Sequence, residues 1–308
     1  MNPPSASTQT LRSQLLLSGA MLLWGLNIPA IKVLTTSFEA VMLSSLRMFF
    51  AWCVFTAITL YHNGRIPKIG RAHWGIVIVC GVFMVYANQI FFTMGMGHTT
   101  ATNTALIVAL GPLMSSVLGS LVFRERLTAT RLLGIALGLI GVGAVILHRP
   151  GATLKGAGFG DAMVAASVLS FAMGGVLVQR LARKLNAITI SWSIYTIGTI
   201  LLALHSCIIG FDAHAIFSDT GSLALVLFSG IGATAIGNLV WNRSIASLGI
   251  SRTALFLNWV PLFAIGFAVV FLKEPMSWWL VFGVACVIAG TWLGSIRTQA
   301  ETTAASKQ

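Results

Sequence analysis

Residues 104–143 read TALIVALGPLMSSVLGSLVFRERLTATRLLGIALGLIGVG, and the chain repeats this pattern once. Residues 253–292 read TALFLNWVPLFAIGFAVVFLKEPMSWWLVFGVACVIAGTW, which aligns with the first copy at a constant offset of 149 positions and without a gap. Each copy is an apolar run interrupted by Pro, then a short charged link, then an apolar run with several Gly residues. The residues identical at this offset are Thr104/Thr253, Ala105/Ala254, Leu106/Leu255, Pro112/Pro261, Leu113/Leu262, Glu125/Glu274, Gly134/Gly283, Ala136/Ala285 and Gly141/Gly290. A repeat of this kind predicts a fold made by duplication.

The composition indicates a membrane protein. Charged residues make up 8% of the 308 residues and hydrophobic residues 56%, whereas an average soluble domain has about 25% charged residues. Apolar runs of about 20 residues, the length that crosses a hydrocarbon core, fill nearly the whole sequence. The cysteines lie in apolar runs without CxxC spacing and are interpreted as small core residues: Cys53, Cys80, Cys207 and Cys286. We therefore expect an all-α polytopic membrane protein.

The apolar runs predict ten transmembrane helices in two five-helix repeats. The expected spans are 14–34, 40–61, 74–95, 102–123, 128–147, 160–180, 187–210, 222–245, 253–272 and 277–296. The corresponding domains are an N-terminal tail (1–13), a first repeat (14–147), a linker loop (148–159), a second repeat (160–296) and a C-terminal tail (297–308). The first span is too long, and lacks the small-residue cleavage site, for a cleaved signal peptide.

The distribution of basic residues predicts the orientation. With the N-terminus in the cytoplasm, cytoplasmic segments hold fourteen of the 19 Lys and Arg residues and external segments hold four, while Arg47 lies within the second span. Cytoplasmic loops carry such an excess, so we expect both termini in the cytoplasm. The net charge of +12 then reflects topology, and nucleic acid is not an expected partner.

Five spans in each half is an odd number, so the two halves insert with opposite orientation. The link at 124–126 (Arg-Glu-Arg) falls on the cytoplasmic side, and its counterpart at 273–275 (Lys-Glu-Pro) falls outside with less positive charge. Inverted repeats with helices broken at matching positions are typical of secondary transporters, whose substrate site lies near the bilayer midplane. Pro112 and Pro261 break their spans at matching positions. We expect gating hinges there, with simple packing kinks as the alternative.

Two five-span copies with these links resemble the EamA-type members of the drug/metabolite transporter superfamily, over nearly the whole chain. The residues that carry the resemblance are Pro112, Arg124, Glu125 and Gly134, their counterparts Pro261, Lys273, Glu274 and Gly283, and also Trp24, Gly25 and Arg47. The resemblance implies a ten-helix, alternating-access exporter of amino acids or other small metabolites in the bacterial inner (plasma) membrane. It also implies that spans 1, 3, 4, 6, 8 and 9 surround a central cavity. Within the superfamily the likeness is closest to bacterial exporters of aromatic and other apolar amino acids.

Polar and aromatic side chains at membrane depth indicate the substrate site. At the offset of 149, Gln89 in span 3 corresponds to Asn238 in span 8, and Phe92 corresponds to Trp241. Polar groups at this depth normally face a cavity or a partner helix, and the alternative is that these amides bond across packed helices. The candidate substrate-binding residues are Trp24, Asn27, Tyr86, Gln89, Asn238, Trp241, Asn242, Asn258 and Trp259.

The scarcity of charged residues within the spans limits the class of substrate that the protein can bind. No Asp or Glu lies in the middle of a span, which argues against exchange of a cation for protons. A phosphorylated substrate would need several basic side chains in the cavity, and only Arg47 lies deep enough. Arg47 is equally consistent with snorkelling to the interface or bonding helix ends. Amides, broken helix ends and aromatic faces fit a net-neutral zwitterion with an apolar side chain, so we expect an amino acid.

The spans do not contain the residues that other functional classes require. The spans contain no paired Asp, Ser/His couple or His/Glu cluster of a membrane hydrolase, and no P-loop, so we expect no enzyme, no cofactor and no metal. The expected partners are a small-molecule substrate and the lipid bilayer. A facilitative channel and an exporter of drugs or other neutral metabolites stay open, as do proton exchange and facilitated diffusion. Gly134, Gly138 and Gly141 predict close-packed helix faces, which meet either within the chain or across a homodimer.

Overall fold

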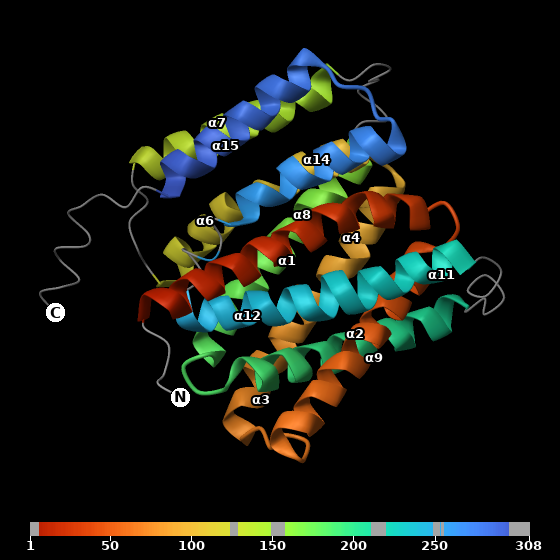
Figure 1. The fold of residues 1–308 in the computed structure, drawn as a ribbon, viewed down its shortest axis with the longest axis vertical. Helices are drawn as coiled ribbons and strands as arrows, with labels where there is room; N and C mark the ends of the chain where they lie inside the picture. The colour runs from red at the N-terminus through yellow and green to blue at the C-terminus, as the bar shows by residue number, and fades with distance from the viewer. Residues whose placement is uncertain are drawn as a thin grey trace, which may run out of the picture.

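The computed structural model describes residues 6–123, 129–148, 158–210, 220–248, 253 and 256–295. Within these ranges every regular element is a helix (Figure 1). The first half contains α1 (Ala6–Leu34), α2 (Ala40–Asn63), α3 (Arg71–Gly81), the π-helix η1 (Val82–Ala87), α4 (Asn88–Gly97), α5 (Ala101–Val108), α6 (Gly111–Phe123) and α7 (Ala129–Leu147). The second half contains α8 (Phe159–Leu181), α9 (Ala187–Ile209), α11 (Thr220–Leu227), the π-helix η2 (Phe228–Ile236), α12 (Gly237–Leu248), the 3-10 helix η3 (Phe256–Asn258), α14 (Trp259–Leu272) and α15 (Trp278–Ser295).

Seven helical segments are long and apolar enough to cross a membrane. They are Gln14–Leu34, Ala40–Asn63, Arg71–Gly97, Ala101–Gly119, Phe159–Leu181, Ala187–Ile209 and Thr220–Ser247, which coincide with expected spans 1–4 and 6–8. Three shorter apolar helices cover the other expected spans: Leu132–Val145, Trp259–Leu272 and Trp278–Gly290. The all-α fold class is thus confirmed for the described residues, while the ten-span inverted repeat stays a prediction.

Side chains at the helix starts supply the hydrogen bonds that the backbone lacks there. Glu39 accepts from the backbone N–H groups of Val41 and Met42 at 2.8 and 3.0 Å, before the first residue of α2. Asn186 accepts from the backbone N–H of Thr189 at 2.8 Å, at the start of α9. Such caps satisfy N–H groups that have no partner within the helix.

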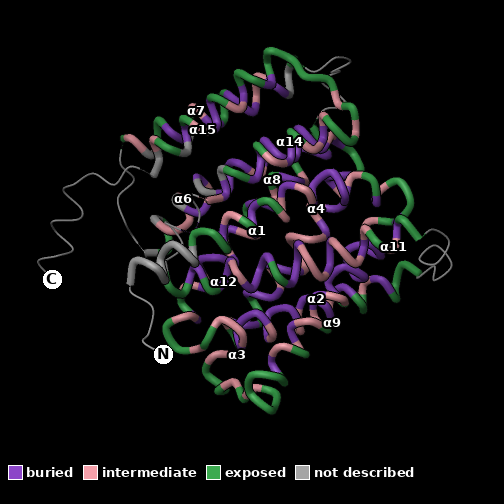
Figure 2. Tube along the Cα trace, viewed as in Figure 1, coloured by how far each residue is buried: buried purple, intermediate pink, exposed green. Residues whose placement is uncertain are grey.

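The packing of the helices follows the duplication. α2 lies along α9 and α7 lies along α15, and each of these pairs joins equivalent helices of the two halves (Figure 1). α1 contacts α14 and α12, and its counterpart α8 contacts α6 and α4. The buried positions gather on the central helices, and the link between α2 and α3 is exposed (Figure 2). Contacts that recur between equivalent helices are what a duplicated fold predicts.

Irregular backbone also occurs at equivalent positions. At the offset of 149, η1 corresponds to residues 231–236, which are the last six residues of η2. Span 4 is interrupted at residues 109–110, between α5 and α6, and the equivalent residues 258–259 are the junction of η3 and α14. π-Helical turns inside α-helices occur frequently at functional sites. The matching irregularities therefore indicate where the functional centre of each half lies.

The two prolines lie at helix starts and not within continuous helices. Pro112 is the second residue of α6 and Pro261 is the third residue of α14. The sequence placed the two breaks at these prolines, and in the structure each break lies just before its Pro. In the first turn of a helix the missing N–H of Pro would have had no partner within the helix in any case. Each Pro thus lies in the first turn of the helix that follows its break.

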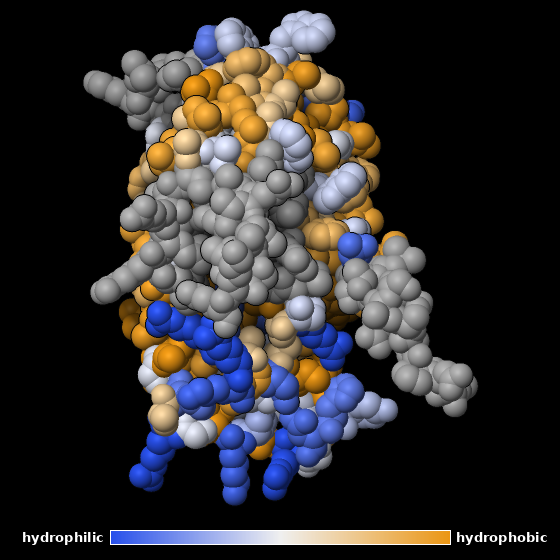
Figure 3. Space-filling model, turned by 90° about the vertical axis from the view of Figure 1, so that its left-hand side faces the viewer, coloured by the Kyte–Doolittle hydropathy of each residue, from blue (hydrophilic) through white to orange (hydrophobic). Residues whose placement is uncertain are grey.

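Exposed basic side chains gather in two links that lie at the same end of the molecule as the start of α1 and the end of α15 (Figure 1). Figure 3 looks onto this end and shows hydrophilic side chains in its lower part beside hydrophobic flanks. The exposed residues are Arg65 and Lys68 between α2 and α3 with Arg71 at the start of α3, and Arg183 and Lys184 between α8 and α9 with Arg180 at the end of α8. This grouping agrees with the charge bias of the sequence.

The glycines of α7 and α15 allow the two helix backbones to touch. A Cβ atom on Gly141 would lie 2.7 Å from the carbonyl oxygen of Gly283, and one on Gly283 would lie 2.4 Å from Cγ2 of Val145. A Cβ on Gly290 would lie 2.5 Å from the carbonyl oxygen of Gly134. The small-residue faces expected from the sequence therefore meet each other within the chain.

We expect Gly141→Val to separate α7 from α15 and to lower the free energy of unfolding by about 1–3 kcal/mol, the usual cost of overpacking. Gly143→Val is the matched control, because a Cβ there has nothing within 4 Å. The measurement is the thermal unfolding midpoint of the purified protein in detergent. Equal midpoints for the two variants would show that the close packing of α7 on α15 does not contribute to stability.

Candidate functional site

A cavity lies where the irregular segments of the two halves meet. It has an empty volume of about 800 Å³, which includes open solvent at its mouth. Residues of α1, α2, η1, α4, α5, α6, α8, α9, η2, α12, η3 and α14 line it. This is the position at which transporters with broken helices hold their substrate.

Residues of equivalent positions line the cavity together. Four pairs separated by 149 residues contribute to its wall: Met84 and Ala233, Gln89 and Asn238, Val108 and Leu257, and Gly111 and Val260. The first pair lies on the π-helices, and the last two lie on either side of the breaks. The irregular backbone of both halves therefore shapes the cavity.

Aromatic rings form one wall. The Trp24 ring lies 5.9 Å from the Phe171 ring at an interplanar angle of 83°, and 5.4 Å from the Trp241 ring. The Trp24 Nε1–H donates to the carbonyl oxygen of Ala233 at 2.9 Å, which joins α1 to η2. Trp24 and Phe171 line the cavity, whereas Trp241 is 1% exposed and supports them from behind. This wall suits an apolar or aromatic group of a ligand.

Arg47 is buried in the cavity wall, on α2. Its Nε donates to Ser229 Oγ, its Nη1 donates to Gln89 Oε1 at 3.0 Å, and its Nη2 is 3.4 Å from Thr234 Oγ1. Gln89 Nε2 donates in turn to Asn88 Oδ1 at 2.9 Å. The network joins α2, α4 and η2 across the cavity wall. All the acceptors of Arg47 are neutral, so its positive charge is not balanced within this network.

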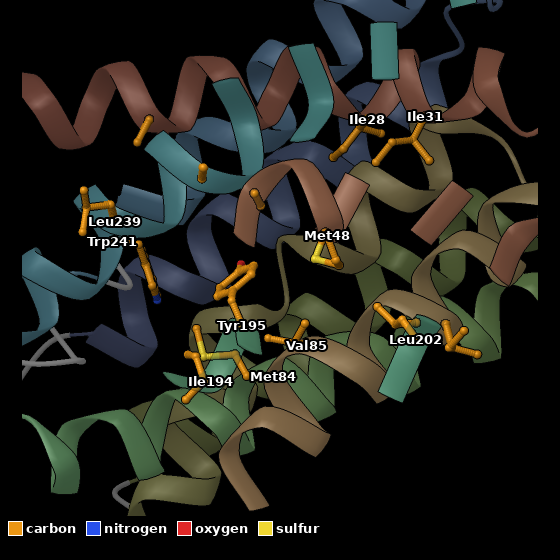
Figure 4. Packing of buried hydrophobic residues seen from close by; sticks show 14 of the residues in the cluster. Ile28, Ile31, Met48, Met84, Val85, Ile194, Tyr195, Leu202, Leu239 and Trp241 are labelled. Atoms are coloured by element: carbon orange, nitrogen blue, oxygen red, sulfur yellow. The ribbon is translucent and has the colours of Figure 1, made fainter. Parts of the chain in front are cut away.

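Tyr195 lines the cavity from α9, the helix equivalent to the one that carries Arg47. Its side chain is 2% exposed, and its ring lies 4.6 Å from the Phe55 ring. Figure 4 shows it among buried apolar side chains that include Met48, Met84 and Ile194. A hydroxyl at the cavity wall adds a further polar group to a largely apolar surface.

Two cavity-lining asparagines retain unbonded oxygens. Asn27 is 9% exposed and Asn238 is 7% exposed, and the Oδ1 atom of each is buried without a hydrogen-bond partner. Asn238 Nδ2 donates to the carbonyl oxygen of Thr234 at 2.9 Å, which fixes the direction of its amide. Buried polar atoms are normally paired. Because both residues line the cavity, these unpaired oxygens are candidate acceptors for the N–H or O–H groups of a ligand.

The structure separates the sequence-predicted residues into those at the cavity and those away from it. Trp24, Asn27, Gln89 and Asn238 line the cavity. Trp241 lies behind Trp24, and the side chain of Asn258 lies outside the described residues. Pro112 and Pro261 begin the helices that follow the two breaks.

Three predicted residues do not line the cavity. The Tyr86 hydroxyl lies 3.0 Å from His205 Nδ1 and faces α9. Asn242 is fully buried, and its Nδ2 donates to Ser191 Oγ at 2.8 Å, so it bonds across packed helices. Trp259 is 51% exposed and stacks on Phe263. The sequence does not fix the direction of a side chain at membrane depth, so it did not separate these three residues from those that line the cavity.

Arg47, Tyr195 and Phe171 line the cavity although the sequence analysis did not place them in the substrate site. The sequence did contain a signal that could have identified Arg47 as a site residue, which is its position within a span. An ionisable residue within a span is by default a candidate for function. Nothing in the sequence distinguished Phe171 from the other aromatic residues of the spans. Within the described residues, no three His, Cys, Asp or Glu side chains are grouped in a way that could hold a metal ion.

The fold, the repeat and the cavity agree with a family of membrane transporters. The family model described as "EamA-like transporter family" matches the chain twice, at residues 11–147 and 158–296. The protein belongs to this family, and each of its halves is one copy of the family domain.

Similar proteins from bacteria and archaea share most of the chain. "Uncharacterized transporter YyaM" of Bacillus subtilis is 27% identical over 244 residues, which are 78% of this chain and 79% of that protein. "Probable amino-acid metabolite efflux pump" of Salmonella typhimurium is 26% identical over 284 residues, 89% of this chain and 91% of that protein. A protein of known crystal structure has a TM-score of 0.69 at 20% identity, over 92% of this chain and 96% of that one. This last likeness supports the fold alone.

We expect Trp24→Phe to loosen the contact between α1 and η2, because the Ala233 carbonyl loses its indole donor. The loss of one such hydrogen bond costs about 1 kcal/mol, and the thermal unfolding midpoint in detergent measures it. Trp259→Phe is the matched control, since the Trp259 ring is largely exposed. If both variants unfold at the wild-type temperature, the indole of Trp24 does not hold α1 against η2.

Proposed function

We propose that this protein is a secondary transporter that exports amino acids with aromatic or other apolar side chains. The observation that carries the proposal is the cavity at the broken helices, whose wall combines aromatic rings with the amides of Asn27, Gln89 and Asn238. Membership of the family supports transport. The printed name of the Salmonella typhimurium relative supports amino acids as a substrate class.

Alternating access is the mechanism that fits this arrangement. In our proposal the ten helices form two inverted repeats, and the helices that begin at Pro112 and Pro261 move relative to the segments before their breaks. A break allows one part of a span to tilt while the other part stays packed. Because the breaks occupy equivalent positions in the two halves, one can close the cavity on one side while the other opens it.

The decisive experiment is counterflow in proteoliposomes that contain the purified full chain. Vesicles loaded with an unlabelled amino acid should accumulate the same labelled amino acid transiently, across a panel that runs from Gly to Trp. Uptake with and without a pH gradient then separates proton exchange from facilitated diffusion. Uptake that shows neither saturation nor counterflow would favour a facilitative channel, and uptake of apolar drugs alone would favour the drug exporter.

We expect Gln89→Ala and Asn238→Ala each to reduce transport about tenfold, because loss of a hydrogen bond to a buried ligand costs roughly 1–3 kcal/mol. Asn103→Ala is the control. Asn103 is also a buried Asn with an unpaired side-chain atom, but it does not line the cavity. Normal transport by both cavity variants would show that these amides only connect helices.

We further propose that both termini lie in the cytoplasm of a bacterial cell, with the protein in the inner membrane. Cysteines introduced at Arg65 and at Met276, both exposed, should be labelled from opposite sides, the first only from the cytoplasm. The labelling uses a variant without Cys53 and Cys207, which are exposed. Labelling of both positions from the same side would contradict the inverted repeat.

A further inference from the structure

Arg47 carries a positive charge that no carboxylate of the cavity balances. It is 2% exposed, and none of the described residues that line the cavity is Asp or Glu. The described carboxylates with printed contacts are engaged elsewhere. Glu39 caps α2, Asp161 accepts from Thr99 Oγ1 at 2.6 Å, and Glu274 accepts from the first residues of α5. A buried cation is costly unless it is paired, so this site favours an anionic group.

The guanidinium retains donors that the protein does not use. Arginine has five N–H groups, and the hydrogen bonds of Arg47 to Ser229, Gln89 and Thr234 engage three of them. One N–H therefore remains on each terminal nitrogen. The bond to Thr234 Oγ1 is long, at 3.4 Å, so a stronger acceptor displaces it easily. Two donors on one planar group match the two oxygens of a carboxylate.

Acceptors without donors lie in the same cavity. Thr234 connects them to Arg47, because its hydroxyl contacts Arg47 Nη2 and its carbonyl accepts from Asn238 Nδ2. Arg47 and Asn238 thus both hydrogen-bond to Thr234, and the Asn238 amide also carries an unpaired Oδ1. Asn27 Oδ1 is the second unpaired oxygen of the cavity wall. An ammonium group, which has three donors and no acceptor, fits these neutral oxygens.

We propose that Arg47 binds the carboxylate of the transported amino acid and that the Asn27 and Asn238 oxygens accept from its ammonium group. This inference rests on the proposed function and specifies how the substrate is chosen. The side chain of the amino acid then lies against Trp24 and Phe171. Because Arg47 is the charged partner and the amides are neutral, the carboxylate contributes most of the affinity. The cavity therefore also accepts apolar carboxylates that lack an ammonium group, and it binds amines without a carboxylate poorly.

The test is isothermal titration calorimetry on the full chain in detergent, with four ligands that share a phenylethyl group and differ in their carboxylate and ammonium groups. They are phenylalanine, 3-phenylpropionate, phenylalaninamide and 2-phenylethylamine. The wild-type protein should bind the first two at least tenfold more tightly than the last two, as expected when a charged hydrogen bond is lost. This comparison needs no variant. Equal affinities, or tighter binding of 2-phenylethylamine, would overturn the role of Arg47.

Two variants then assign the groups. Arg47→Gln should weaken binding of phenylalanine about tenfold to a hundredfold and leave phenylalaninamide unchanged, so that the ratio of their affinities approaches one. Asn27→Ala should weaken phenylalanine and leave 3-phenylpropionate unchanged. Arg65→Gln, at an exposed link, is the charge-matched control. A purely structural role of Arg47 would weaken all four probes together and leave the ratios as in the wild type, which contradicts the inference.

The two proposals fail in different ways. If no amino acid of the counterflow panel is transported by the wild-type protein, the proposed function is wrong. If amino acids are transported but phenylalanine and phenylalaninamide bind alike, export stands and the assignment of Arg47 is wrong. Where Arg47→Gln does not fold, Arg47→Lys keeps the charge without the planar pair of donors, and it should bind 3-phenylpropionate more weakly than the wild type does. Unchanged binding in that variant also overturns the inference.

Discussion

The structure depends on one constraint, which is that a chain in hydrocarbon has no water to satisfy its backbone. Every N–H and C=O group within the membrane needs a partner in the protein, so irregular backbone is tolerated only where it is buried or lines a cavity. Four irregular segments occur in the described spans: η1, residues 109–110, η2 and the junction of η3 with α14. Residues in or directly beside each of them line the cavity. The site therefore lies where the fold departs from regular helices, and the duplication places such departures in both halves.

η2 shows how side chains stabilise such a segment. Trp24 donates to the Ala233 carbonyl, Asn238 donates to the Thr234 carbonyl, and Arg47 donates to the Ser229 hydroxyl. The Trp24 and Arg47 donors come from α1 and α2, so η2 is tied to two neighbouring helices, while the Asn238 bond is local to the span that η2 and α12 form together. Gly237, directly after η2, leaves room for the indole, since a Cβ there would lie 2.4 Å from Trp24 Nε1. The hydrogen bonds that hold the fold together are thus the same ones that shape the cavity.

The sequence predicted the positions of the breaks better than the directions of the side chains. Pro112 and Pro261 marked the interruptions because Pro cannot continue a helix, and the constant offset paired Gln89 with Asn238. The π-helices had no signal, since FSGIGATAI and VFMVYA read as ordinary apolar helix. Asn242 and Trp259 were expected at the cavity because each lies at membrane depth in an amide–aromatic pair, Asn242 beside Trp241 and Trp259 beside Asn258. In spans that are apolar on all sides, periodicity does not reveal which face is inward, so only the packed structure separates Asn238 from Asn242.

Charged side chains near the helix ends also hold one turn of the fold in place. The turn between α4 and α5 is held by side chains from three other segments. Lys32 of α1 donates to the carbonyls of Met96 and Thr99, and Asp161 of α8 accepts from the Thr99 hydroxyl. Glu274 accepts from the N–H groups of Ala101 and Thr102 and from the Thr102 hydroxyl. α4 and α5 line the cavity further along their length. Any movement that separates them from α1 and α8 at this end must break these hydrogen bonds. Glu125, the equivalent of Glu274 in the first copy, lies outside the described residues. In the described copy, the bonds to Lys32, Asp161 and Glu274 therefore hold one end of the cavity-lining helices α1, α4, α5 and α8 together.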